Sequence, residues 1–142
     1  MKNLQLTFIL TLLVFTVKSQ YSGGIAIESL LKTDTTITGQ GFSYPGIQND
    51  EITILKITFK PGQSTGWHKH EFPVFAYILQ GELTAELETG RTLHYPEETS
   101  FAEVINTWHN GSNTGKEDLI LIVTYLGEKG KELSVKKETI DP

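Results

Sequence analysis

The sequence predicts an all-β protein, an antiparallel sandwich or barrel, and three observations support this. Apolar and polar residues alternate with period two in several short runs, the pattern of strands with one buried face. Turn-forming pairs, Pro61-Gly62, Gln80-Gly81 and Thr89-Gly90, separate these runs at short spacing. Helical periodicity is scarce along the same stretch.

The expected strands follow from these signals in order. Residues 25–38 form a weak first strand region with a bend near 33–34, and a loop rich in glycine and proline follows. The run 52–60 is a strong strand with residues 53, 55, 57 and 59 on one face. The apolar run 74–79 is typical of a strand buried on both faces. The remaining expectations are a hairpin of 83–88 with 91–95, a strand at 100–105, a turn-rich stretch at 106–115 and a last strong strand at 119–126.

Composition limits the chemistry. A chain of 142 residues supports one domain, and a formal net charge of −5 argues against a nucleic-acid-binding protein. The absence of cysteine excludes disulfides, thiolate nucleophiles and zinc fingers. Any metal ion must therefore be held by histidine, aspartate or glutamate, which directs attention to the four histidines.

Residues 1–19 have the pattern of a secretory signal peptide. Lys2 precedes an apolar run, and the small residues Val17 and Ser19 stand at the −3 and −1 positions of a cleavage after Ser19. The run is shorter than the about 20 apolar residues of a transmembrane helix. We therefore expect an exported protein, periplasmic or extracellular, with no stable membrane anchor after cleavage. Cleavage removes two lysines and no acidic residue, so the mature chain would carry a charge of −7.

The rest of the chain divides into three parts by composition. An N-terminal strand region covers 20–38, a barrel covers 39–126, and a charged C-terminal tail covers 127–142.

Three histidines have spacings that suit one metal ion. His68 and His70 are two residues apart, so on an extended segment both side chains point to the same face. His109 lies after a later strand, within the turn-rich stretch, and a third ligand from a neighbouring strand would complete a facial set of three nitrogens with open positions. His94 has no histidine two residues away and is interpreted as a surface or structural residue.

Two motifs around these histidines resemble those of the cupin superfamily. Gly62, five residues, His68-x-His70 and then Gly81 match the first cupin motif in spacing, and His109 with Asn113 matches the end of the second. The resemblance covers residues from about 39 to 126. It implies a small, single-domain, exported cupin of the type-2 conserved-barrel kind, folded as a double-stranded β-helix (jelly-roll) barrel.

The chain also departs from these motifs. Val74 stands at the usual glutamate position, and Glu98, Val104 and Asn106 stand at the usual glycine, proline and glycine positions of the second motif. Asn106 adopts positive φ more readily than most residues, so we expect that turn to survive.

Three alternatives follow from the missing glutamate. The site is a three-histidine metal centre, resembling the thiol dioxygenase and diketone-cleaving cupins; or a carboxylate from elsewhere replaces the glutamate; or no metal binds and the histidines line a binding cavity. Glu103 is the candidate for an additional ligand, because it shares strand parity with Phe101 and lies six residues before His109. Glu71 should point to the opposite face from His70.

The resemblance implies a functional hypothesis. His68, His70 and His109 bind a divalent metal ion (Fe, Mn, Ni, Cu or Zn) in a pocket for a small organic ligand, and the protein is a dioxygenase or lyase in which the metal is a Lewis acid or redox centre. The alternative is a non-catalytic periplasmic or extracellular binding protein.

Aromatic residues near the histidines give two further expectations. Phe75, Tyr77 and Phe101 are candidates to line the pocket. Trp67 and Trp108 each precede a candidate ligand and should point away from it. A homodimer is expected, since sheet edges and exposed aromatics invite pairing.

Overall fold

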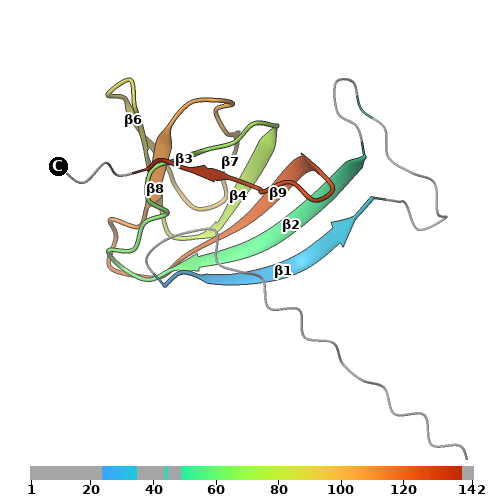
Figure 1. The fold of residues 1–142 in the computed structure, drawn as a ribbon. Coiled ribbons are helices and arrows are strands. Elements are labelled where there is room, and N and C mark those ends of the chain that lie inside the picture. The colour runs from blue at the N-terminus through green and yellow to red at the C-terminus, as the bar shows by residue number, and fades with distance from the viewer. Residues whose placement is uncertain (1–23, 35–43, 45–48, 139–142) are drawn as a thin grey trace, which may run out of the picture.

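The computed structural model describes residues 24–34, 44 and 49–138, and this part of the chain consists of strands and their connections (Figure 1). In chain order the strands are β1 (Ala26–Thr33), β2 (Asp50–Phe59), β3 (His68–Lys69), β4 (Val74–Gln80), β5 (Leu83–Leu87), β6 (Thr92–Tyr95), β7 (Ser100–Ala102), β8 (His109–Ser112), β9 (Leu119–Glu128) and β10 (Val135–Lys136). The expected signal peptide, residues 1–19, lies outside the described residues.

The strands form two five-stranded sheets, and every pair of neighbouring strands is antiparallel. The larger sheet has the order β1-β2-β9-β4-β7, and the smaller one has the order β10-β3-β8-β5-β6. Apart from the neighbouring pairs β1–β2 and β5–β6, consecutive strands of the chain pass between the two sheets, as Figure 1 shows for β2, β3 and β4. The all-β barrel predicted from the alternation pattern is confirmed.

The core lies on the inner face of the larger sheet. β2 and β9 pair along ten residues each, and their side chains alternate between buried and partly buried. The face of β2 that carries residues 53, 55, 57 and 59 is the buried one, because side chains at every second position leave water together when the sheet closes. The core includes Leu55, Ile57, Phe59, Val74, Ala76, Ile78, Leu119, Leu121, Val123 and Tyr125.

β4 corrects one expectation about burial. Phe75, Tyr77 and Leu79 are 46%, 40% and 45% exposed, whereas Val74, Ala76 and Ile78 between them are buried. The expectation that residues 74–79 are buried on both faces is therefore wrong. β4 lies between β9 and β7 in the larger sheet, and among the described residues nothing covers the outer face at these three side chains.

The stretch expected to be turn-rich contains a strand. β8 lies at residues 109–112 and pairs with β3 on one side and with β5 on the other. Its sequence, His-Asn-Gly-Ser, has little intrinsic strand preference, so its pairing with both neighbours determines its conformation. At Gly111 a Cβ atom would lie 3.4 Å from the Leu83 side chain, which leaves little space for a larger residue.

Two non-glycine residues of the second motif adopt the conformation expected of the glycines they replace. Glu98 has φ of 63° and Asn106 has φ of 53°, both in the left-handed region. The expectation that the turn at Asn106 survives is confirmed. Their hydrogen bonds hold these turns, since the Glu98 N–H donates to Ile78 O and the Asn106 N–H donates to His70 O.

Asn113 ties the end of β8 to the larger sheet. Its side chain is buried, and its Nδ2 donates to the carbonyls of Phe59 (3.1 Å) and Glu117 (2.7 Å). Its Oδ1 accepts from the Gly115 N–H at 2.9 Å. Three main-chain groups thus depend on one amide, which explains physically why this position needs asparagine.

The charged C-terminal tail returns to the barrel. After β9 the chain turns at Gly130 (φ 83°), and β10 then pairs with β3 (Figure 1).

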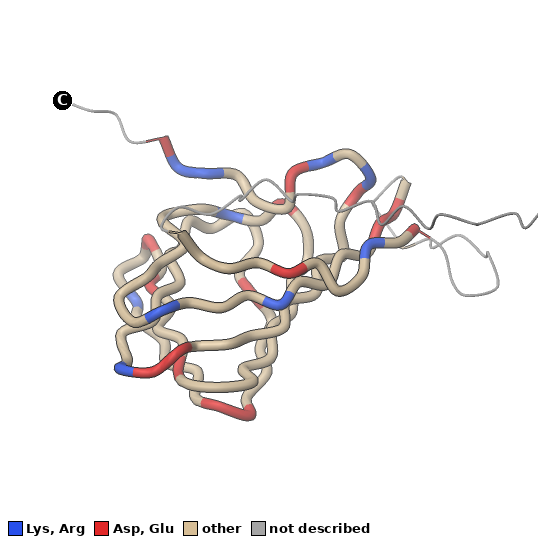
Figure 2. The backbone as a smooth tube through the Cα atoms, turned by 90° about the horizontal axis from the view of Figure 1, so that it is seen from below, with Lys and Arg blue, Asp and Glu red and all other residues tan. Residues whose placement is uncertain are grey.

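Lysines and arginines are scattered over several strands and loops and alternate with acidic positions, as Figure 2 shows. Within the described ranges the chain holds no helix with the length and hydropathy of a membrane span.

Candidate metal centre

Three histidines meet inside the barrel. His68 of β3 is paired directly with His109 of β8, and His70 follows one residue after β3. All three are buried, and one ligand atom from each lies within 4.8 Å of the others. The structure therefore brings together the three histidines that the sequence predicts as ligands. His94 lies on β6 at the surface beside Glu82, outside this cluster.

Each of the three imidazoles is oriented by a main-chain carbonyl. Nδ1 of His68 lies 2.9 Å from Gly66 O, Nδ1 of His109 lies 3.0 Å from Thr107 O, and Nδ1 of His70 lies 2.7 Å from Leu133 O. A carbonyl oxygen only accepts, so each Nδ1 carries the proton and each Nε2 presents a lone pair in the neutral ring. This second contact to a carbonyl is the arrangement that orients histidine ligands in metal sites.

Glu103 adds a carboxylate to the cluster. Its Oε2 lies 2.8 Å from His109 Nε2 and 3.9 Å from His70 Nε2, and its side chain is 16% exposed. The short contact is not aligned as a hydrogen bond, and His109 Nε2 is a buried nitrogen without a hydrogen-bond partner. A buried ring nitrogen that makes no aligned hydrogen bond and lies beside a carboxylate is a donor set that suits a divalent cation.

The backbone explains how Glu103 reaches the site. The Glu103 N–H donates to Val74 O at 2.9 Å, and the neighbouring pair Phe75 and Ala102 is in register between β4 and β7. Val74 itself points into the core. Glu103 thus stands across the sheet from the position where the motif has glutamate, and the carboxylate comes from the adjacent strand instead.

Burial keeps two of the histidines neutral. The pKa of His68 is lowered to about 4, mainly by burial and in addition by the positive charge of the neighbouring His109. Burial also lowers the pKa of His70, an effect that the Glu103 carboxylate partly offsets. Both rings are therefore unprotonated at neutral pH, which is the state that a metal ligand requires.

His109 and Glu103 behave as an ion pair in the metal-free chain. Burial alone would lower the pKa of His109, but contact with the Glu103 carboxylate outweighs burial and raises it. Burial alone would raise the pKa of Glu103, but His109 and the other two histidines outweigh burial and lower it. A cation placed between them would take the position of the His109 proton.

The cavity beside the histidines is small. It has a volume of about 30 Å³, which is space for only one or two water molecules, and its polar lining groups include His68, Glu103 and His109. Phe101, one of the three aromatic candidates, lies in its otherwise apolar wall. The prediction that Phe75 and Tyr77 line this pocket is wrong, because they point outwards from β4.

A stacked aromatic pair borders the site, and the sequence analysis missed one of its members. A second cavity of about 30 Å³ shares Phe101, Glu103 and His109 with the first and is also lined by Tyr95. Tyr95 stacks on Phe101 with ring centroids 3.7 Å apart and an interplanar angle of 12°. The alternation of β6 places Tyr95 inward opposite Leu83 in the hairpin, a signal that the sequence contained.

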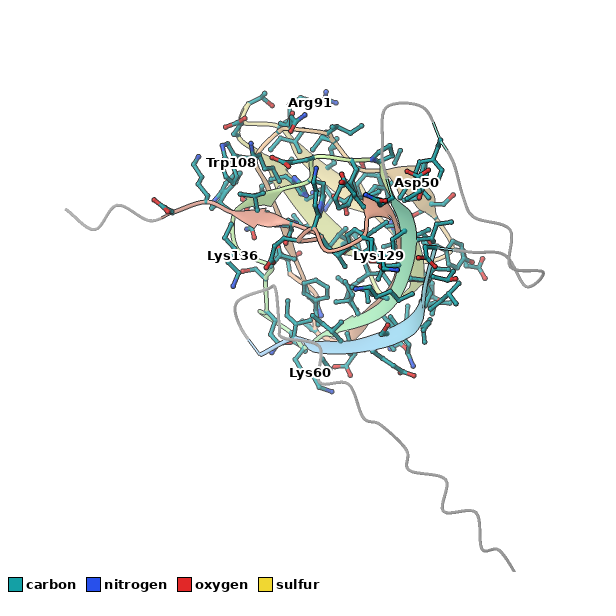
Figure 3. All side chains as sticks on the ribbon, turned by 45° about the vertical axis from the view of Figure 1, so that its right-hand side comes forward. Asp50, Lys60, Arg91, Trp108, Lys129 and Lys136 are labelled. Atoms are coloured by element: carbon teal, nitrogen blue, oxygen red, sulfur yellow. The ribbon has the colours of Figure 1, made fainter. Side chains whose placement is uncertain are left out.

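The two tryptophans point away from the histidines, as predicted. Trp67 is 39% exposed, and the Lys137 ammonium lies 5.6 Å from the ring centres of both Trp67 and Trp108. The Lys69 ammonium lies 5.3 Å from the Trp108 ring. In Figure 3 Trp108 and Lys136 lie on the same side of the barrel, on which the C-terminal strand runs. Glu71 is exposed, as expected from its position next to His70.

Fold and site together define a small antiparallel barrel with a buried three-histidine cluster compatible with metal binding. Comparison with protein families agrees. Residues 55–125 match the family described as a cupin domain (Cupin_2), and the chain belongs to the cupin superfamily, with the double-stranded β-helix fold. No curated protein matches the chain.

Solved structures share the fold at low sequence identity. An uncharacterised conserved protein with a double-stranded β-helix domain from Klebsiella pneumoniae is 16% identical, with 87% of this chain and 97% of that chain covered and a TM-score of 0.59. A structure from a study of the DMSP lyases RdDddP and RnDddQII is 16% identical, with 61% and 44% covered and a TM-score of 0.53. The oxalate decarboxylase of Lactobacillus farciminis is 19% identical, with 60% and 26% covered and a TM-score of 0.53. The chain therefore spans less than half of the length of the last two.

Proposed function

We propose that this cupin binds one divalent metal ion through Nε2 of His68, His70 and His109, with the Glu103 carboxylate as a fourth ligand. The metal is Fe, Mn, Ni, Cu or Zn. The single observation that carries the proposal is the shared orientation of the three imidazoles, whose Nδ1 atoms are each held by a carbonyl while one ligand atom of each ring lies close to the others. Packing of the barrel core does not by itself require three buried histidines whose rings converge in this way.

The carboxylate explains how the site balances charge. Three neutral imidazoles leave the full charge of a divalent cation in a buried place, and burying uncompensated charge is costly. Glu103, whose pKa is lowered by the histidines, supplies one negative charge beside His109. With four protein ligands, an octahedral ion keeps two positions for other molecules.

A bound ion would supply Lewis-acid or redox chemistry to a small organic ligand. In this proposal the residues of the chain hold that ion, exclude bulk water from it through the apolar wall around Phe101, and provide in Glu103 a carboxylate close to any ligand that binds there. The enzymatic form is a dioxygenase or a lyase. The second candidate function is a non-catalytic small-molecule-binding cupin.

Elemental analysis of the purified protein tests the metal. After expression in metal-replete medium we expect close to one ion per chain in the wild type and in His94→Ala, which removes the surface histidine. We expect almost none in His70→Ala. Glu103→Gln should retain the fold and bind metal more weakly than the wild type, since the amide is a poorer ligand. Wild-type protein free of metal would overturn the proposal and favour the metal-free binding cavity.

The organic ligand needs space that this conformation lacks. Each of the two small cavities is walled by Phe101, so Phe101→Ala should join them and open the site from the side of Tyr95. A thermal-shift screen of small carboxylates and diketones on the metal-loaded protein distinguishes the two functions. Stabilisation with turnover supports an enzyme, and stabilisation without turnover supports a binding protein.

We also propose that the protein is exported, on the basis of the apolar run and the small residues at 17 and 19. The mature chain would begin at Gln20. Intact-mass measurement of the protein from fractionated cells tests this. A mass that lacks residues 1–19, in the periplasmic or extracellular fraction, is the expected result, and a full-length cytoplasmic protein would refute it.

We further propose a homodimer formed through the outer face of the larger sheet. Leu30, Leu31, Phe75, Tyr77 and Leu79 are large hydrophobic side chains that are all at least 40% exposed in β1 and β4. Apolar surface gathered on one sheet face is typical of an interface between subunits. Light scattering after size exclusion should give twice the chain mass for the wild type and Thr92→Glu, and a single chain mass for Tyr77→Glu. A monomeric wild type would refute the proposal.

A further inference from the structure

The C-terminal segment makes its closest contacts with the histidine strand. β10 pairs with β3 so that Val135 lies opposite Lys69 and Lys136 lies opposite His68. The Lys137 N–H donates to Trp67 O at 2.9 Å and continues the pairing. Residues 133–137, here called the strap, therefore run along the segment that carries two of the candidate ligands.

One ligand depends on the strap in a way that the others do not. His68 and His109 are each oriented by the carbonyl two residues earlier in their own segment, at Gly66 and Thr107. His70 is instead oriented by Leu133 O, which is 63 residues later in the chain. At 2.7 Å this is the shortest of the three contacts.

Only two residues of the strap, Leu133 and Ser134, are buried or partly buried against the barrel. Leu133 packs against the core while it remains partly exposed, and Ser134 is buried. Both residues of β10 are exposed. The strap therefore adds little to the hydrophobic core, and its removal should leave the larger sheet and the other four strands of the smaller sheet intact.

We propose that the strap is a positioning element for His70, and that its docking and metal binding at the site are coupled. The Leu133 carbonyl selects the Nδ1–H tautomer of His70 and turns Nε2 towards His109 and Glu103. When the strap leaves, His70 loses that partner, and the ring can present either nitrogen. This inference rests on the proposed metal site, and the coupling is reciprocal, so a bound ion must hold the strap in place to the same extent.

Two variants and two matched controls test the proposal. Truncation after Glu132 removes the strap, and truncation after Glu138 is its control. Val135→Pro removes one N–H from β10 at an exposed position, and Val135→Ala keeps the N–H there. Circular dichroism and urea unfolding show whether each variant folds, and Val135→Pro serves as the test if the truncated chain does not.

The first readout is cobalt binding. Co²⁺ titrations followed by visible absorption give both the affinity and the ligand geometry. We expect about 10- to 100-fold weaker binding and an altered spectrum for the strap variants, as for other groups that orient metal ligands. The two controls should match the wild type. Equal affinity and equal spectra in the full and strap-free chains would overturn the proposal.

The second readout does not need a metal. In the metal-free wild type, ¹⁵N shifts of the His70 ring should report a protonated Nδ1. The strap variants should show a mixture of His70 tautomers, while the His68 ring keeps its own. A merely structural role for the strap would leave the His70 tautomer unchanged, and that result would refute the positioning role. If the wild type binds no cobalt, the metal proposal and the coupling both fail, whereas the tautomer result still decides whether the strap orients His70.

The third readout is the reciprocal effect. Carboxypeptidase Y, which also releases a C-terminal proline, should digest the full chain back through residues 133–138 more slowly when Co²⁺ is saturating. The expected factor is about the one by which strap removal weakens metal binding. An equal rate with and without Co²⁺ would contradict the coupling.

Discussion

Acid should destabilise the metal-free protein through His68, and the effect has a calculable size. A histidine has a pKa of 6.5 in the unfolded chain, and burial lowers the pKa of His68 to about 4. Between these values the unfolded state binds a proton that the folded state does not, so the free energy of unfolding falls as the pH falls from 6.5 towards 4. At pH 5.0 this linkage amounts to about 2 kcal/mol relative to pH 7.5.

The choice of pH 5.0 separates His68 from the other groups of the site. Glu103, whose pKa is lowered from 4.5, is still ionised there. His109, whose pKa is raised, loses its stabilising contribution above pH 6.5 and not below it. His70, whose pKa is also lowered, adds a loss in the same direction as His68. A comparison that changes His68 alone is therefore needed.

The assay is urea unfolding of chelator-treated protein at pH 7.5 and 5.0, followed by tryptophan fluorescence. We expect the wild type to lose about 2 kcal/mol more on acidification than His68→Gln, which cannot take up the proton. Asn110→Ala, a neutral change on β8, should lose as much as the wild type. If His68→Gln loses as much stability as the wild type to within about 0.5 kcal/mol, the assignment of the acid loss to His68 is refuted.

Three other measurements follow from the site and its turns. Metal affinity should fall as the pH is lowered through the raised pKa of His109, with about one proton released per ion bound. Calorimetry in two buffers of different ionisation enthalpy measures the number of protons released. An affinity that does not change with pH would contradict the prediction. Asn113→Ala should lower the free energy of unfolding by about 3 to 4 kcal/mol, because a buried amide with three hydrogen bonds is lost. Asn110→Ala should cost under about 0.5 kcal/mol, and equal losses in urea unfolding would argue against this reasoning. Glu98→Gly should stabilise the protein by about 1 kcal/mol by relieving its positive φ, and Asn106→Gly by less; a lower melting temperature for Glu98→Gly would show the reasoning to be wrong.

The sequence was sufficient wherever a pattern is local. The alternation in β2 and the glycine turn between β5 and β6 depend on neighbouring residues, and both elements were predicted. The pair His68 and His70 was likewise placed on one face, because extended backbone repeats every two residues.

Features that depend on distant contacts were harder to predict. β8 has weak strand preference and forms because β3 and β5 pair with it, so its residues were interpreted as turns. The outer face of β4 is apolar in sequence, and apolar character alone could not distinguish a buried face from an exposed one.

The candidate site also combines features that local sequence patterns predict with features that depend on distant contacts. Strand parity indicated Glu103 as one alternative, but only the pairing of β7 with β4 places its carboxylate beside His109. The contact between His70 and Leu133 joins residues 63 positions apart, and no local pattern marks it.

In this chain the carboxylate comes from Glu103 and not from position 74, and this shift affects how related sequences are recognised. A coordination site requires an oxygen at a point in space, and either of two facing strand positions can deliver it. A search template that insists on glutamate at the first position would discard this chain as defective. A template written as His-x-His followed later by Glu, five residues and His would retrieve it, together with any other barrels that carry their carboxylate on the neighbouring strand.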